Sequence, residues 1–493
     1  MTPAEGGDQT GDSVSAETIE ADAIVGPEAP KGRARIEVAG GRIASVAPAD
    51  GAANGTVVMA APTNAHDHGR GLRTLAFGAV DDALECWLLT LSREPKLPAY
   101  ERAAVAFARM AEGGVANANH SHTPQTPGGL IEECGEVSRA ARDVGIRVAF
   151  AAPYSDRNPL VYGDPTALLE SAPTLSSRLR GRAMSGVAVA DYLRSVEEMA
   201  AFEHAGFSIQ YCPVGPQWVS DEALAAIAEA SAETGRRIHM HLLETAIQRE
   251  WADHAYPGGI LKFMDSVGFL SPRLSVAHGV HLREDECELL AERGVIVSVN
   301  TSSNFRLRSG IAPVKRFLKA GVRFGIGLDA QPMDDDDDIL REMRLVWLNH
   351  RGFGLEDVLD PDRLLGAVTV DGRRAVVGED PAGGRIAVGA PADLLVLDLA
   401  AMTPDMVSPD EDPMTVILTR ATRRHIRRLM VAGRTVVSDG RCVSVDLAAM
   451  EATLIDEARA NWQTPPVSRE EMMTHVRRYY RCGCHIGQPF TAD

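Results

Sequence analysis

The chain has 493 residues, of which 45% are hydrophobic and 24% are charged, a composition typical of a globular protein with a large core. Its formal net charge of -18 argues against binding nucleic acid or an anionic membrane surface through bulk electrostatics. No run of about 18 apolar residues occurs, so a soluble protein without a transmembrane helix is expected.

The first residues, 1–20, are acidic and rich in Gly, Ser and Thr. They lack the basic and apolar segments of a secretory signal peptide. We therefore expect a disordered leader on a cytoplasmic protein. The 7 cysteines are an odd number scattered from Cys86 to Cys484, which indicates a reducing compartment rather than a disulfide framework.

Residues 21–60 alternate between apolar residues and others and are rich in β-forming residues, with a hairpin turn predicted at Gly40 and Gly41. Between 61 and 379 the pattern changes to short apolar strands that alternate with amphipathic helices. Strands are predicted at 147–152, 237–241, 274–278, 295–299 and 322–328, and helices at 222–234, 285–293 and 339–350. Because so many strand–helix units in about 300 residues favour a closed parallel sheet, we expect a TIM-like (β/α)8 barrel of the α/β class.

The β-rich pattern returns at 380–445, where 384–398 predicts two strands around a Gly/Pro turn and 428–437 predicts a hairpin. Neither terminal β segment is long enough to be stable alone, so 21–60 and 380–445 are expected to pair into one small β-sandwich domain. Residues 446–493 are expected to form a C-terminal helix and a tail. In that tail Cys482, Cys484 and His485 could hold a metal, but an exposed tail is favoured because no second Cys pair accompanies them.

His66 and His68 lie at the end of the first predicted barrel strand. Residues i and i+2 of a strand point to the same side, so the two imidazoles can converge on one metal. The carboxyl end of a barrel strand is where barrel active sites lie. The H-x-H pattern is nevertheless common, and a chance pair is the alternative.

Further polar residues close other buried strands, where an apolar residue or Gly is the ordinary choice. They are His241 with Glu244 three residues later, His278, and Asp329. Together with the histidine pair they predict a metal site. His239 competes with His241 as the ligand because the two alternate on one strand; an interior or supporting role is the alternative for His239.

The order H-x-H, H-x-x-E, His, Asp resembles the amidohydrolase superfamily, and within it the cytosine, guanine and S-adenosylhomocysteine deaminases and the s-triazine hydrolases. The segments 277–282, 300–314, 342–345 and 389–398 support a resemblance that covers about residues 23–445.

The resemblance implies that His66, His68, His241 and Asp329 bind one divalent metal, zinc or alternatively iron. It assigns Glu244 as the proton shuttle and His278 as the residue that orients the hydroxide or the developing oxyanion. Asp329 would also accept a proton from water. His241 is favoured over His239 because only His241 is followed by Glu at the third position.

Binuclear members of the superfamily bridge two metals with a carboxylated Lys on the fourth barrel strand. The corresponding segment, 206–218, contains no Lys, so a single metal is expected. The resemblance also suggests substrate contacts for Gln217 and Glu94. A structural role in the loop is the alternative for Gln217, and matching Glu94 requires a gap.

Two other sets of polar residues each have two possible roles. His120 and His122 end the second predicted strand, and hydrogen-bonded interior histidines are favoured over a role in the pocket. Asp334–Asp338 precede the helix at 339–350; carboxylates that complement a helix N-terminus are favoured over a second metal site.

The favoured function is hydrolytic deamination of an amino-substituted nitrogen heterocycle, such as a pyrimidine, purine, pterin or triazine. The alternative is removal of chloride or an alkylamine from a similar ring. A non-catalytic interaction protein is disfavoured, because such a relative should have lost metal ligands. The P-C-x-x-C signature of zinc deaminases that act on polynucleotides is absent. The expected partners are a small heterocyclic substrate and further copies of the chain in a homo-oligomer, a dimer or larger, with no nucleic acid and no membrane.

Overall fold

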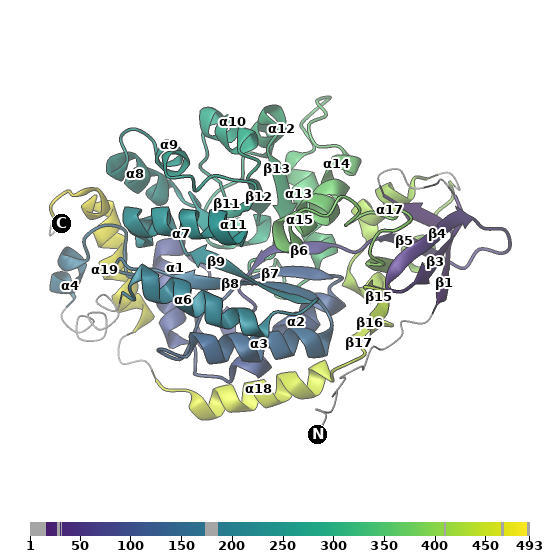
Figure 1. Ribbon diagram of the computed structural model, residues 1–493, viewed down its shortest axis with the longest axis horizontal. Coiled ribbons are helices and arrows are strands. Elements are labelled where there is room, and N and C mark those ends of the chain that lie inside the picture. Colours follow the sequence, from purple (N-terminus) through teal and green to yellow (C-terminus); the bar gives the residue numbers. More distant parts are fainter. Residues whose placement is uncertain are drawn as a thin grey trace, which may run out of the picture.

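A parallel barrel forms the centre of the structure (Figure 1), a computed structural model that describes residues 16–26, 30, 32–172, 186–408, 411–464 and 468–490. Its sheet runs in chain order from β6 to β13, and all neighbours are parallel. The strands are β6 (Thr63–Asp67), β7 (Asn117–Ser121), β8 (Arg147–Tyr154), β9 (Phe207–Pro213), β10 (Ile238–Leu242), β11 (Leu274–His278), β12 (Ile296–Val299) and β13 (Arg323–Ile326). The backbone N–H of Asp329 donates to the carbonyl of His66 at 2.9 Å and so joins the last strand to the first. The predicted (β/α)8 barrel is confirmed.

Helices follow the barrel strands and cover the outside of the sheet (Figure 1). Helix α7 (Asp221–Thr234) shows why they form where they do: the Ser220 hydroxyl caps its first turn, and Gly235 ends it at a φ of 73°. The remaining helices of this part are α1 (Leu84–Thr90), α2 (Ala99–Glu112), α3 (Leu130–Val144), α4 (Thr166–Ser171), α6 (Val189–Met199), α8 (Ala246–Ala255), α9 (Ile260–Ser266), α10 (Glu284–Glu292), α11 (Thr301–Arg306), α12 (Val314–Ala320), α13 (Ile339–His350), α14 (Pro361–Gly366) and α15 (Gly372–Val377). The three predicted helices correspond to α7, α10 and α13.

Two β-sheets form a separate β domain beside the barrel, at the right of Figure 1. One sheet contains β1 (Glu17–Ala21), β3 (Ala34–Ala39) and β4 (Arg42–Pro48), and the other contains β2 (Ala23–Val25), β5 (Thr56–Ala60), β14 (Leu394–Asp398), β15 (Ile426–Val431), β16 (Arg434–Ser438) and β17 (Arg441–Cys442). Ile36 and Ile43 of the first sheet share a buried apolar cluster with Val58, Leu394 and Met430 of the second. Since β14 pairs with β5, the predicted sandwich of N- and C-terminal segments is confirmed.

Two details of this β domain differ from expectation. Residues 1–15 of the predicted leader 1–20 lie outside the described residues, but β1 begins at Glu17, because its residues pair with β3. Residues 384–398 were expected to give two strands and give only β14. Gly384 and Gly389 have φ values of 75° and 83°, so the segment between them turns instead of extending. Short helices α16 (Leu399–Met402) and α17 (Pro413–Arg420) follow β14.

The C-terminal region contains two helices where one was expected. Helix α18 (Leu447–Asn461) packs against α2, and α19 (Arg469–Arg481) packs against α1 and α4 at the left of Figure 1. The prediction of an exposed tail is wrong, because Cys484 and His485 are buried beside α8. Cys482 and Cys484 form a disulfide, and the other five cysteines, which all lie in described segments, are free.

No helix within the described ranges is both long and apolar enough to cross a membrane. The homo-oligomer and the cytoplasmic location expected from the sequence stay predictions.

Candidate metal centre

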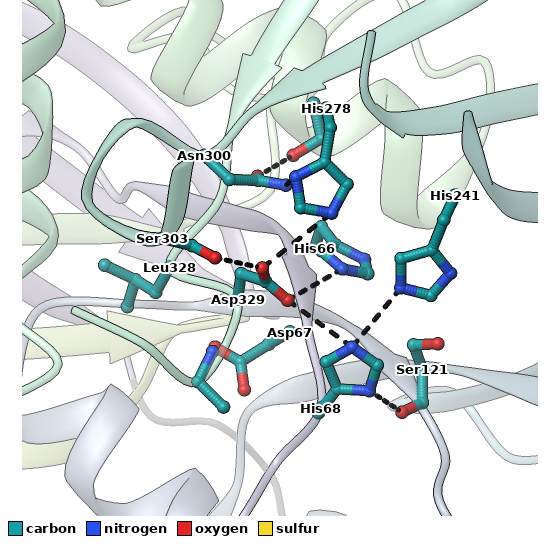
Figure 2. Close-up of polar contacts among 12 residues, drawn as sticks. His66, Asp67, His68, Ser121, His241, His278, Asn300, Ser303, Leu328 and Asp329 are labelled. Atoms are coloured by element: carbon teal, nitrogen blue, oxygen red, sulfur yellow. Dashed lines mark hydrogen bonds and ion pairs between the residues drawn. The ribbon is translucent and has the colours of Figure 1, made fainter. Parts of the chain in front are cut away.

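Histidines and a carboxylate from four different barrel strands meet at the carboxyl end of the barrel (Figure 2). His66 lies in β6 and His68 directly follows it, His241 lies in β10, His278 ends β11, and Asp329 follows β13. In Figure 2 their side chains point toward one another. The structure therefore brings together the five residues that the sequence placed at separate strand ends.

The distances in this cluster suit one small cation. Asp329 Oδ1 lies 3.0 Å from His66 Nε2 and 3.4 Å from His68 Nε2, and His68 Nε2 lies 3.3 Å from His241 Nε2. His66 Nε2 is buried and has no hydrogen-bond partner among the described residues. Three imidazole nitrogens and one carboxylate oxygen are a donor set that Zn²⁺ accepts. The residues present thus fit a divalent metal ion.

Carbonyl groups orient two of the imidazoles. His68 Nδ1 lies 3.0 Å from the carbonyl of Ser121, and His241 Nδ1 lies 2.7 Å from the carbonyl of Val214. A carbonyl only accepts hydrogen bonds, so each Nδ1 carries the proton and each Nε2 presents its lone pair to the cluster.

His239 lies behind His66 rather than in the cluster. Its Nε2 is hydrogen-bonded to His66 Nδ1 at 2.7 Å, and its Nδ1 to the hydroxyl of Ser275 at 2.8 Å. Both ring nitrogens are therefore engaged away from the point where the Nε2 atoms of His66, His68 and His241 converge.

Burial keeps these histidines neutral. It lowers the pKa of His66 and of His68 well below the ordinary value, and it lowers the pKa of His241 to about 4, with His278 contributing to the last shift. A metal binds the unprotonated imidazole, so the cluster is ready to accept a cation at neutral pH without first releasing protons.

Asp329 and His278 adopt backbone conformations that non-glycine residues seldom adopt, with φ values of 55° and 74°. Hydrogen bonds hold their side chains: the hydroxyl of Ser303 donates to Asp329 Oδ2 at 2.5 Å, and His278 Nδ1 lies 2.9 Å from Asn304 Oδ1. His278 Nε2 is thereby placed 3.8 Å from Asp329 Oδ2 and 3.5 Å from Glu244 Oε2.

Glu244 is a buried carboxyl group beside the cluster. The Ser309 hydroxyl donates to its Oε1 at 2.9 Å, and burial raises its pKa to about 7 although nearby His278 opposes the shift. A carboxyl group with a pKa near neutrality can both donate and accept a proton at working pH.

The two predicted substrate contacts lie in different surroundings. Gln217 lies in the short helix η4 (Pro216–Trp218); its Nε2 is buried and has no hydrogen-bond partner within the described part of the chain. Glu94 is held in a buried ion cluster, with Oε2 2.9 Å from Arg70 Nη1 and Oε1 3.5 Å from Arg102 Nη2. Gln217 is thus free to bind another group, whereas Glu94 already has charged partners.

His120 and His122 form an interior hydrogen-bonded pair, as favoured from the sequence. Their Nε2 and Nδ1 atoms lie 3.1 Å apart, and His122 Nε2 lies 2.8 Å from Glu133 Oε2.

In the run Asp334–Asp338, one carboxylate has the favoured role of complementing the helix N-terminus. Asp338 caps α13 by accepting from the N–H groups of Leu340 and Arg341 at 3.1 Å. The other four carboxylates pair with arginines, so each member of the run has a partner.

Two residues that support the cluster, Asp67 and Ser303, are not among those predicted from the sequence. Asp67, between the two histidines of β6, accepts from the backbone N–H groups of Gly69 at 2.7 Å and Ala330 at 3.1 Å, and so ties the end of β6 to the residue after Asp329. Ser303 was also missed. Its signal is the polar run 300–304 directly after a buried strand.

Known proteins resemble this chain in sequence. The family model described as "Amidohydrolase family" matches residues 57–436. An 8-oxoguanine deaminase from Pseudomonas aeruginosa is 29% identical over 407 residues, which cover 80% of this chain and 85% of that protein. A 5-methylthioadenosine/S-adenosylhomocysteine deaminase from Nitratidesulfovibrio vulgaris is 33% identical over 241 residues, or 49% of this chain, and the match spans about half of that relative, 54%.

Solved structures share the fold. An adenosine deaminase from Xanthomonas campestris with bound zinc has a TM-score of 0.73 at 24% identity, covering 90% of this chain and 98% of that one. An atrazine chlorohydrolase from Arthrobacter aurescens complexed with zinc has a TM-score of 0.75 at 19% identity, covering 90% of this chain and 99% of that one. Because the family match extends from β5 through the barrel to β16, and the barrel has the same architecture as these structures, the chain belongs to the amidohydrolase family.

Proposed function

We propose that the protein is a hydrolytic deaminase of an amino-substituted nitrogen heterocycle that uses one zinc ion held by His66, His68, His241 and Asp329. The observation that carries the proposal is the geometry of the cluster. Asp329 Oδ1 lies 3.0 Å and 3.4 Å from the Nε2 atoms of His66 and His68, and His68 Nε2 lies 3.3 Å from His241 Nε2, beside a buried carboxyl group with a pKa of about 7. The 8-oxoguanine deaminase that matches 80% of the chain supports the choice of an aminated ring. The absence of Lys from β9 supports a single ion.

A bound divalent cation acidifies water and so supplies hydroxide at neutral pH. Asp329 would take up a proton from the attacking water on one carboxylate oxygen, while the Ser303 hydroxyl holds the other, Oδ2, at 2.5 Å. His278 orients the oxygen that attacks the ring, since its own Nδ1 is held by Asn304 at 2.9 Å.

Glu244 moves the protons of the substrate. In its protonated form it donates to the ring nitrogen beside the carbon under attack, which removes the charge that develops there. Having given up its own proton, it takes the proton of the hydroxyl group now bound to that carbon and passes it to the departing amino group, because neutral ammonia leaves far more readily than amide ion. The proton held by Asp329 then restores the acid form of Glu244. Its burial and its position beside His278 suit this exchange.

We propose Gln217 as a residue that recognises the ring. Its buried Nε2 has no protein partner in the described segments, and leaving such a donor unpaired costs about 1–3 kcal/mol. We infer that it donates to a ring nitrogen or an oxo group of the substrate. A contact from Glu94 stays a prediction, and it would require the carboxylate to exchange Arg70 or Arg102 for substrate.

The test is a panel of aminated purines, pyrimidines, pterins and triazines, assayed for ammonia release with zinc-loaded protein. Chelator-treated protein is the control, and restoring zinc should restore activity. Release of chloride or alkylamine from matched rings, without ammonia from any aminated ring, would replace deamination with the alternative hydrolysis. No product from any ring would refute the proposed chemistry.

A further inference from the structure

A helix cap fixes the backbone of Glu244. Thr245 is the N-cap of α8, and its hydroxyl accepts from the N–H of Gln248 at 3.1 Å. The side-chain oxygen of Gln248 reaches back and accepts from the backbone N–H of Glu244 at 2.7 Å. Gln248 therefore holds the residue from which the Glu244 side chain projects.

Buried side chains in turn hold Gln248. Its Nε2 donates to the hydroxyl of Tyr162 at 3.2 Å, and that hydroxyl donates to Glu85 Oε1 at 3.2 Å. Thr245 donates to the same oxygen of Glu85 at 2.5 Å. Tyr162, Gln248 and Glu85 are only 1%, 1% and 4% exposed, so water cannot replace a lost partner cheaply.

The C-terminal helix fixes Tyr162. The hydroxyl of Tyr480 accepts from the backbone N–H of Tyr162 at 3.1 Å, and the hydroxyl of Tyr479 donates to its carbonyl at 2.9 Å. Both tyrosines belong to α19, which packs against α1 and α4, the helices that follow β6 and β8 at the carboxyl end of the barrel. Figure 1 shows α19 at this end, opposite the β domain.

We propose that Tyr162 is a positioning residue for Glu244, and that Tyr479 and Tyr480 make the C-terminal helix part of the same positioning network. The inference rests on the proposed proton-transfer role of Glu244. Its physical basis is that proton transfer needs a geometry correct to a fraction of an ångström, and a displacement of about 1 Å can cost about 10²-fold in rate. Each link from Tyr480 to Glu244 is a hydrogen bond between buried groups.

Tyr162→Phe tests the proposal, because it keeps the ring and removes the hydroxyl on which Gln248 and Glu85 depend. With 8-oxoguanine as substrate, or the panel member that is turned over fastest, kcat should fall about tenfold while KM changes less than about twofold and the metal content stays the same. In the Glu244→Gln background the same change should have no further effect, because the group that it positions can no longer relay protons.

Tyr192→Phe is the matched control. Tyr192 is 3% exposed, and its hydroxyl also makes two hydrogen bonds, to the carbonyl of Ala152 at 2.8 Å and from the N–H of Cys212 at 3.0 Å. The Tyr192→Phe variant should lower Tm about as much as Tyr162→Phe does, and it should leave kcat unchanged. A merely structural role for Tyr162 would make the two variants alike.

Tyr480→Phe extends the test to α19. By hydrogen–deuterium exchange with mass spectrometry, peptides covering 240–250 should exchange faster in Tyr480→Phe and Tyr162→Phe than in Tyr192→Phe. A kcat for Tyr162→Phe within about twofold of the parent, an additive loss in the Glu244→Gln background, or unchanged exchange at 240–250 would overturn the inference. If Glu244→Gln itself keeps full activity, it is the proposed role of Glu244 that fails.

Discussion

Glu244→Gln separates proton relay from simple attack by hydroxide. Glutamine keeps the shape of the side chain and its hydrogen bond with Ser309, 2.9 Å in the parent, but it cannot carry a proton between substrate atoms. With a pKa of about 7, about half of the Glu244 side chains are protonated at pH 7 and available as the acid. General acid–base catalysis of this kind contributes about 10²–10⁴-fold.

We therefore expect kcat to fall by at least about 10²-fold, which corresponds to a rise of about 2.7 kcal/mol in the activation free energy, while KM and metal content stay nearly unchanged. The assay is steady-state ammonia release at pH 7, together with elemental analysis of the same preparation. Glu250→Gln makes the same exchange on α8 at an exposed residue that contacts His485, and it should keep full activity. A Glu244→Gln variant with near-normal ammonia release would refute the relay and leave Asp329 and His278 as the acid–base groups.

Three further predictions concern the ligands, their support and a buried carboxyl group. His241→Ala should lose most of its metal while His239→Ala retains it, as measured by elemental analysis; the reverse pattern would reassign the ligand. Ser303→Ala should keep the metal but lose about tenfold in kcat, because Asp329 Oδ2 loses its donor, and an unchanged kcat would exclude that role. Burial raises the pKa of Glu342 from 4.5 to about 7, so the stability that its neutral form provides is present below pH 4.5 and is lost as the pH rises through about 7. Urea unfolding should then show that the free energy of unfolding of Glu342→Gln, relative to that of the parent, increases by up to about 3 kcal/mol from pH 5 to pH 9. A difference in unfolding free energy that does not change with pH would contradict the assignment.

The sequence predicts the barrel and its cluster for a local reason. His66, His241, His278 and Asp329 each lie at or just beyond the carboxyl end of a buried strand, and the carboxyl ends of parallel strands meet at one edge of a barrel. The local sequence therefore predicts which residues lie at strand ends, and the parallel pairing of the strands brings those ends together.

The supporting contacts have no such local signal. Tyr162 and Tyr480 are 318 residues apart, and neither lies in a pattern that distinguishes it from any other buried aromatic residue. Asp67 was visible between the two histidines, but its bond to Ala330 depends on closure of the barrel. His239 and His241 could be ranked only by the spacing to Glu244, because alternation on a strand does not show which imidazole has its Nε2 free.

Titrating Zn²⁺ into metal-free protein while measuring ammonia release tests the central claim most directly. Asp329 contacts His66 and His68, and His68 contacts His241, so activity should rise linearly and saturate at about one equivalent of zinc per chain. His66→Ala and Asp329→Ala should prevent the rise. Saturation only at two equivalents, or full ammonia release before any zinc is added, would contradict the account.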